Sequence, residues 1–207
     1  MVILTQDPSF RALAHCIYDG NKTIYVDICS YSLGSNVGFD KVFNACQDME
    51  SQYISKIDRV LEEHNLKIDK VFSETPPPVS QYSPGLFALD THILSSLWKH
   101  YPSISEMYSI PPSYVKTLRG SNNKSDSTQL AKYYINEVLA DDIDVVIAET
   151  ISDKGRHMKG VMNNDKAEAF LFMLRVFCKY DILGLKSKIE NEISGFIKEP
   201  EKLLIQR

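Results

Sequence analysis

The chain has 207 residues, of which 43% are hydrophobic and 24% are charged, and its formal net charge is −4. This length predicts one large domain or two small ones, with enough chain to bury a core. No apolar run approaches the roughly 20 residues of a transmembrane helix, and no basic segment precedes the short apolar start, so we expect neither a membrane span nor a signal peptide. The acidic balance disfavours wrapping of nucleic acid over the whole surface but permits a local basic groove.

Cysteine usage indicates a reducing compartment. The cysteines form no C-x-x-C pair, and none has a histidine at the spacing of a zinc site. We therefore expect reduced, mostly buried thiols in a cytoplasmic protein. The cysteines are Cys16, Cys29, Cys46 and Cys178.

The first 30 residues predict an antiparallel meander of three strands. Asp19-Gly20 separates two apolar runs and is a hairpin signal. Asp7 follows the first apolar run and precedes Pro8, which cannot donate to a strand ladder, so we expect Asp7 near the end of a central strand. An aspartate at a strand end is commonly a turn former, and it gains chemical interest only if other carboxylates reach the same place. The expected strands are residues 2–5, 12–18 and 22–28.

The middle and end of the chain predict helices alternating with short strands. Apolar residues recur at steps of three and four from Val42 to Val60, which is typical of one face of a long helix. Glu74 ends a short strand because the prolines at 76–78 stop ladder pairing. The expected helices are 39–64, 83–98, about 126–139 and 164–180, the expected strands are 68–73 and 103–110, and residues 141–149 fit either a strand or the edge of a helix.

Two segments are basic. Lys116, Arg119 and Lys124 surround a Gly-Ser-Asn-Asn loop that leads into a helix. Such a loop suits phosphate contacts through lysine, backbone N–H groups and the helix dipole, although a solvated loop with ordinary surface lysines explains the residues equally well. The second basic segment, residues 152–159, is better explained as a solvated loop.

Four carboxylates each stand where an element begins or ends: Asp7, Glu74, Asp165 and Glu168. Asp165 and Glu168 lie three residues apart and share one face at the start of the last long helix, where capping alone would also favour acidic residues. Carboxylates gathered in one place repel one another unless a hard divalent cation neutralises them. Two Mg²⁺ ions about 3.5–4 Å apart activate water and stabilise the leaving oxygen of a phosphodiester.

The element order is three strands, helix, strand, helix, strand, helix, helix. This order predicts an α/β fold of the ribonuclease H-like (retroviral integrase) superfamily, with a mixed sheet and helices on both faces. In that fold the first and fourth strands are neighbours, and the last helix packs beside them. We expect this domain to span residues 1–182 and residues 183–207 to form a peripheral helix or tail.

Four segments carry a resemblance to a known family, in order and spacing over residues 1 to about 180. The chain resembles the RuvC-type Holliday junction resolvases, and more closely the branch encoded by lactococcal phages. The segments are VILTQDPSFRALAHCIYD, KVFSE, YSIPPSYVKTLRGSNNKSDSTQ and NNDKAEAFLFML.

The resemblance implies a homodimer that binds four-way or otherwise branched DNA in the cytoplasm of a bacterial host. Each subunit would cut one strand and leave a 5′ phosphate and a 3′ hydroxyl. By resemblance, the metal ligands are Asp7, Glu74, Asp165 and Glu168, which hold two Mg²⁺ ions per active site, with Mn²⁺ able to substitute. Lys116 would act as a catalytic basic residue near the cut. The implied DNA-binding residues are Lys116, Arg119 and Lys124.

The chain departs from the family pattern at several positions. Ser9 stands where the family often has glycine after Asp-Pro, and Glu168 stands where its last carboxylate is usually aspartate. Ser127 occupies the place of a second lysine at the start of the following helix, and the segment 142–163 is longer than its cellular counterpart. The longer side chain of Glu168 is expected to shift the second metal. The last two departures predict a relaxed sequence preference and freer acceptance of forks and other branches.

The leading interpretation is a Mg²⁺-dependent, structure-selective DNA endonuclease. The main alternative is a protein of the same fold that binds branched DNA without cutting it, which four intact acidic positions disfavour. An actin-like ATPase is disfavoured because the residues after Asp7 lack the glycines of a phosphate loop. Cleavage of RNA in a hybrid duplex is chemically feasible, but the loop motif disfavours it.

Overall fold

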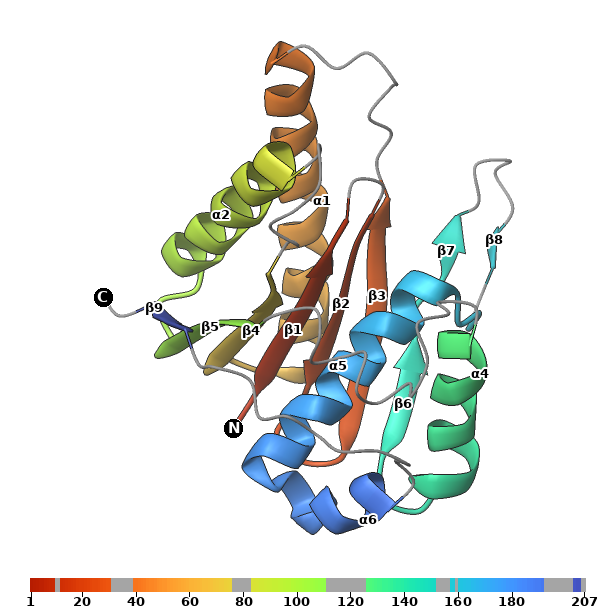
Figure 1. The fold of residues 1–207 in the computed structure, drawn as a ribbon. Helices are drawn as coiled ribbons and strands as arrows, with labels where there is room; N and C mark the ends of the chain where they lie inside the picture. The colour runs from red at the N-terminus through yellow and green to blue at the C-terminus, as the bar shows by residue number, and fades with distance from the viewer. Residues whose placement is uncertain are drawn as a thin grey trace.

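The computed structural model describes residues 1–9, 12–30, 39–75, 83–110, 126–151, 157–158, 160–191 and 203–205. The main sheet is mixed and seven-stranded, and helices cover both of its faces (Figure 1). Its strands are β1 Ile3–Pro8, β2 Ala12–Tyr18, β3 Thr23–Ser30, β4 Lys70–Glu74, β5 Glu106–Ile110, β6 Asp144–Ile147 and β9 Leu203–Ile205. The helices are α1 Phe39–His64, α2 Ser83–His100, α4 Asp126–Tyr133 with a π-helical continuation Tyr134–Val138, α5 Asn164–Tyr180 and α6 Lys186–Asn191, with a 3-10 turn at Ile182–Gly184.

The strand order is β6-β3-β2-β1-β4-β5-β9. Strands β1, β2 and β3 form the expected antiparallel meander, and β4 and β5 run parallel to β1. β1 and β4 are therefore neighbours, and the ribonuclease H-like arrangement predicted from the element order is confirmed. Residues 144–147, left open between strand and helix by the sequence, form β6, which pairs in parallel with β3. Two short strands, β7 Thr150–Ile151 and β8 His157–Met158, form a separate pair.

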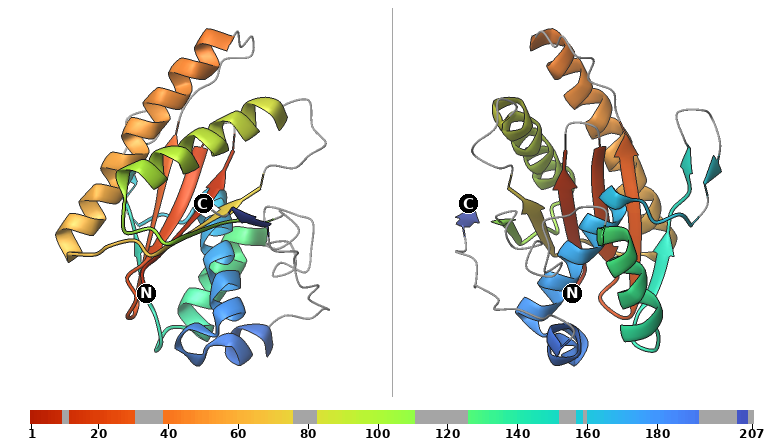
Figure 2. Two further views of the ribbon diagram at one scale, coloured as in Figure 1. Left: turned by 90° about the vertical axis from the view of Figure 1, so that its left-hand side faces the viewer. Right: turned by 45° about the vertical axis from the view of Figure 1, so that its right-hand side comes forward.

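Each face of the sheet has its own core. Helices α1 and α2 cover one face, and α4 and α5 cover the other (Figure 2). The apolar stripe of α1 predicted from its periodicity is buried at Cys46, Met49, Tyr53 and Ile57. Helix α5 crosses β1, β2 and β3, and every residue from Lys166 to Cys178 is buried. A helix that is buried on all sides serves as a core element rather than as a surface cover.

Strand β1 is longer than the sequence predicts. We expected it to end at residue 5, but it continues through Asp7 to Pro8, which pairs with Leu13 of β2. Pairing with β4 has already ended at Gln6, opposite Ser73, so Pro8 lies beyond the part of β1 that has strands on both sides. Asp7 is consequently held inside a strand at its carboxyl end, and does not lie in the turn that follows.

The cysteines match the expectation of buried thiols. All of them are free and buried, and burial raises the pKa of Cys29 to about 12 and that of Cys178 to about 11. Thiols with such high pKa values are poor nucleophiles and poor metal ligands at neutral pH. In the part of the chain that the structure describes, no helix combines the length and the apolar character that a membrane crossing requires.

The C-terminal segment takes part in two elements. Helix α6 packs against α5, and β9 pairs antiparallel with the outer edge of β5. The last strand of the chain thus extends the sheet beside β5, next to the strand that carries Glu74.

Candidate functional site

Asp7 and Glu74 lie at the same end of two adjacent parallel strands. The register pairs Gln6 with Ser73, and the next residues along β1 and β4 are Asp7 and Glu74. Side chains alternate between the faces of a strand, so Asp7 shares a face with Ile3, and Glu74 shares a face with Phe72. Ile3 and Phe72 belong to the core under α5, and Asp7 and Glu74 are both partly exposed. The two carboxylates therefore project from the α5 face of the sheet, at its solvent-accessible edge.

The other two candidate carboxylates lie near the start of α5, Asp165 in its first turn and Glu168 at the beginning of its second. The side chain of Asn163 caps the first turn by accepting a hydrogen bond of 2.9 Å from the backbone N–H of Lys166. Asp165 is exposed, whereas Glu168 is buried and accepts a hydrogen bond from the hydroxyl of Ser127 on α4. The partial positive charge of a helix N-terminus favours the anion of Asp165, which lies in the first turn.

The N-terminal ends of α4 and α5 are joined by side chains. Besides the Ser127–Glu168 hydrogen bond, Thr128 Oγ1 donates to Asn164 Oδ1 over 2.6 Å. Lys166 ties the first turn of α5 to the end of β6, because its buried Nζ donates to the carbonyl of Ala148 over 2.7 Å. Burial lowers the pKa of Lys166. Ser127, which stands where the family pattern has a lysine, thus contacts one of the carboxylates directly.

We expect Ser127→Ala to lower the free energy of unfolding by about 1–3 kcal/mol, because a buried carboxylate loses a charge-assisted hydrogen bond. Urea unfolding at neutral pH measures the loss. Thr128→Ala is the matched control: it removes an exposed hydrogen bond between the same two helices and should cost less. Equal losses for the two variants would mean that burial of Glu168 adds nothing to the strength of its bond to Ser127.

The carboxylates do not form a complete metal site. Among the residues that the structure describes, no group of three or more His, Cys, Asp or Glu side chains is arranged to hold a metal ion. Asp7 and Glu74 fit as two ligands of one divalent cation, because they are oxygen donors that end adjacent strands on one face. Asp165 and Glu168 lie on the helix that packs over that face but do not complete a set of three with them.

The predicted DNA-binding residues fall in a segment between β5 and α4. Lys116, Arg119 and Lys124 lie outside the described residues, as does most of the second basic segment. The helix expected after the basic loop is present, since α4 begins at Asp126. Ser9, which replaces the usual glycine, donates from its backbone N–H to the carbonyl of Ala12 over 2.8 Å and accepts from the Ala12 N–H over 3.1 Å. This serine therefore closes the connection from β1 to β2.

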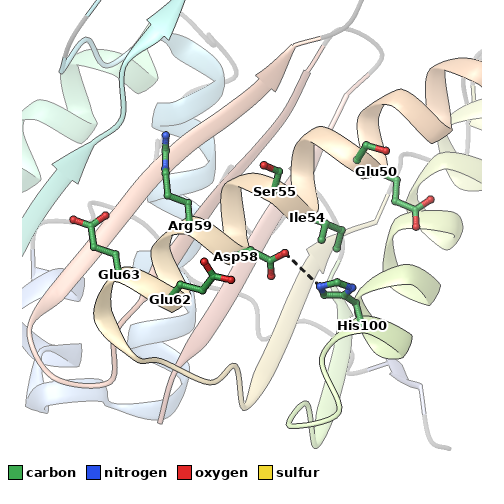
Figure 3. A pocket seen from close by; sticks show the side chains of 9 residues that line it. Glu50, Ile54, Ser55, Asp58, Arg59, Glu62, Glu63 and His100 are labelled. Carbon is green, nitrogen blue, oxygen red and sulfur yellow. Dashed lines mark ion pairs between the residues drawn. The ribbon is translucent and has the colours of Figure 1, made fainter.

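A surface groove of about 730 Å³ lies along α1 (Figure 3). It is not part of the candidate carboxylate site, because it lies on the other side of the sheet. Helix α1 covers the face of the sheet opposite to that of Asp7. The groove is lined by Glu50, Asp58, Glu62 and Glu63 with Arg59 and His100, and His100 pairs with Asp58 at 3.4 Å. Its acidic lining would repel the phosphates of a nucleic acid.

Sequence reasoning missed a buried polar cluster directly behind the two strand-end carboxylates. Gln6 and Ser73 lie on the α2 face of the sheet and contact Asp90 of α2. The available signal was a glutamine at a core-facing position of a central strand, two residues after Leu4. A fully buried amide needs partners, and these partners are far away in the sequence.

Comparison with known proteins identifies the fold. The chain is similar to the structure of Thermus thermophilus RuvC in complex with a Holliday junction substrate, with a TM-score of 0.50, 10% identity, and coverage of 87% of this chain and 96% of that chain. The chain is also similar to T. thermophilus RuvC alone, with a TM-score of 0.45, 11% identity, and coverage of 88% of this chain and 98% of that chain. The yeast mitochondrial Holliday junction resolvase Ydc2 matches with a TM-score of 0.43, 13% identity, and coverage of 86% of this chain and 85% of that chain. No family model and no curated protein sequence matches the chain. The chain therefore has a RuvC-like fold, as the motif resemblance predicted.

Proposed function

We propose that this protein is a Mg²⁺-dependent, structure-selective DNA endonuclease that resolves Holliday junctions and cuts other branched DNA. The observation that carries the proposal is the placement of Asp7 and Glu74 at the ends of adjacent parallel strands, in a fold similar to that of a junction-bound RuvC. Their face of the sheet is the one over which α5 packs, with Asp165 and Glu168 in the first two turns of that helix.

The proposed active site uses the chain's oxygen donors to hold the cation. Asp7 lies one residue before the end of the central strand β1, and in this proposal it would be shared between Glu74 on β4 and the carboxylates on α5. In this proposal, Glu74 completes one metal position, and Asp165 with Glu168 completes a second. These residues would hold a divalent cation, whose Lewis acidity would lower the pKa of a water molecule and offset the charge that develops on the phosphate.

The proposal gives the basic loop the task of holding DNA. Lys116 would contact the phosphate near the cut, and Arg119 and Lys124 would contact neighbouring phosphates. Backbone N–H groups at the start of α4 would add to these contacts, because a helix N-terminus attracts anions. A homodimer would present two such sites to a four-way junction, so that each subunit cuts one strand.

A second candidate function is favoured by one observation. Within the described part of the chain the carboxylates form no group of three that is ready to bind a metal, as expected for a protein that binds branched DNA without cutting it. The two candidates make opposite predictions about divalent cations. The nuclease needs them for turnover, whereas binding through basic residues alone does not.

Cleavage of labelled four-way, three-way and linear duplex DNA tests the proposal, with Mg²⁺ or EDTA and with gel-shift binding measured in parallel. We expect cutting only of the branched substrates and only with Mg²⁺. Tight binding to branched DNA without cutting, in Mg²⁺ and in Mn²⁺, would establish the second candidate instead. Equal cutting of linear duplex would contradict structure selectivity.

A further inference from the structure

A buried hydrogen-bonded cluster joins β1, β4 and α2. Asp90 Oδ1 accepts from Ser73 Oγ over 2.5 Å and from Gln6 Nε2 over 3.2 Å, and Gln6 Nε2 also lies 3.0 Å from Ser73 Oγ. On the other side, Gln6 Oε1 accepts from the hydroxyl of Tyr53 on α1 over 2.9 Å. Gln6, Ser73 and Tyr53 are fully buried, and Asp90 is 5% exposed.

The cluster lies directly behind the two candidate metal ligands. Gln6 and Ser73 are the last residues of β1 and β4 that pair with each other, and Asp7 and Glu74 are the residues that follow them. Side chains alternate along a strand, so Gln6 and Ser73 project from one face of the sheet. Asp7 and Glu74, one residue further along the same strands, project from the opposite face. A side chain that bridges Gln6 and Ser73 therefore restricts the separation and the tilt of the backbone segments that carry Asp7 and Glu74.

Burying an ionisable group in a core costs free energy of desolvation. Burial raises the pKa of Asp90 to about 6, even though the hydrogen bonds from Ser73 and Gln6 lower it. Well-packed apolar side chains commonly stabilise a core as well as buried ionisable groups do. A fully hydrogen-bonded polar network instead favours one relative position of the strands. A shift of one strand past the other would leave buried donors or acceptors without partners.

We propose that Asp90 is a positioning residue for the active site: by accepting hydrogen bonds from Gln6 and Ser73, it holds the carboxyl ends of β1 and β4 at the separation at which Asp7 and Glu74 bind one divalent cation. This inference rests on the proposed function. Asp90 is not itself a ligand, since it lies on the other face of the sheet, among the core residues under α1 and α2.

Two substitutions at this position separate the role of the acceptor from the role of the charge. Asp90→Asn keeps an oxygen that can accept from both Ser73 and Gln6, whereas Asp90→Leu fills a similar space without an acceptor. We expect Asp90→Leu to weaken divalent-cation binding about 10- to 100-fold, as loss of the groups that orient metal ligands does, and Asp90→Asn to stay within about threefold of the parent protein. The readouts are calorimetric titration with Mn²⁺ in the absence of DNA, and the Mg²⁺ concentration that gives half-maximal cleavage.

Ser73→Ala is the second test, because it removes the shorter of the two hydrogen bonds to Asp90 with little change in volume. It should shift the cation affinity in the same direction as Asp90→Leu and keep the inference testable if Asp90→Leu does not fold. Leu94→Ala is the matched control: Leu94 is buried on the same helix, so this variant loses stability without losing the acceptor. The rate of cleavage at saturating Mg²⁺ should remain within a few-fold of the parent in Ser73→Ala.

The outcomes distinguish the inference from the function on which it rests. If the parent protein binds Mn²⁺ and cleaves, but Asp90→Leu and Ser73→Ala bind the cation as the parent does, the positioning role is overturned and the nuclease stands. A shift of the same size in Leu94→Ala would also overturn it, because general loss of stability would then explain the effect. A parent protein that neither binds Mn²⁺ nor cleaves branched DNA overturns both.

Discussion

Asp7→Asn is expected to abolish cleavage of branched DNA, with a rate at least about 10³-fold below that of the parent protein, while DNA binding persists. The substitution removes the charge of the carboxylate that the proposed site shares between its metal positions, so stabilisation of the transition state is lost. Binding should be unchanged or tighter, because a negative charge close to the bound phosphates has been removed. Single-turnover cleavage and gel-shift titration of the same four-way junction measure the two effects separately.

Asp48→Asn is the matched control for this experiment. Asp48 is an exposed aspartate of α1, on the helix that covers the opposite face of the sheet, so the same chemical change should leave cleavage intact. Cleavage at the parent rate by Asp7→Asn would remove Asp7 from the proposed ligands. A parallel loss of binding and cleavage would show that Asp7 supports the fold or the DNA contact instead of the chemistry.

Phe177→Ala is expected to cause the largest loss of stability, about 3–5 kcal/mol in the free energy of unfolding. The side chain of Phe177 is fully buried in α5, and its ring meets that of Tyr18 edge-on at a centroid distance of 4.8 Å. Its removal leaves a cavity between α5 and the sheet and deletes an aromatic pair. For a chain of this length the melting temperature should fall by roughly 10 °C, which calorimetry or urea unfolding will measure.

The control for the aromatic truncation is Phe87→Ala on α2. Phe87 is 37% exposed, so less apolar surface returns to water and the surroundings can relax. A loss of stability as large as that of Phe177→Ala would contradict the description of α5 as a central element of the core. Because α5 carries Asp165 and Glu168 in its first two turns, Phe177→Ala should also lose activity at lower temperatures than Phe87→Ala.

The features that sequence predicted well are local or periodic. The hairpin signal at Asp19-Gly20 and the alternation of apolar runs predicted the meander, and the 3.6-residue period predicted α1 and α5. The order of these elements then predicted that β1 and β4 are neighbours in the sheet, because topology rules allow few folds for that order of strands and helices. Asp7 and Glu74 were predicted at strand ends because prolines follow each of them within two residues.

What sequence could not predict are the contacts between distant side chains. Gln6 bonds to residues 67 and 84 positions away, and Ser127 bonds to a residue 41 positions away, and no local pattern encodes such pairs. The extension of β1 to Pro8 was missed for a related reason: whether a proline is tolerated in a strand depends on which neighbour still pairs there. The four carboxylates were proposed from residue type and position in the chain, but their separation depends on packing of α5 against the sheet.

The position of α5 has a consequence for synthesis of the protein. Strand β3 ends at residue 30, and α5, which covers the face of β1, β2 and β3, ends only at residue 180. At about 5–20 residues per second, the ribosome needs roughly 8–30 seconds to add the intervening chain. During that time the nascent meander exposes the apolar face that α5 covers in the folded protein. We therefore expect chaperones to bind the meander during synthesis, because its apolar surface stays exposed for many seconds. The carboxylates of α5 reach the sheet only after most of the chain has been synthesised.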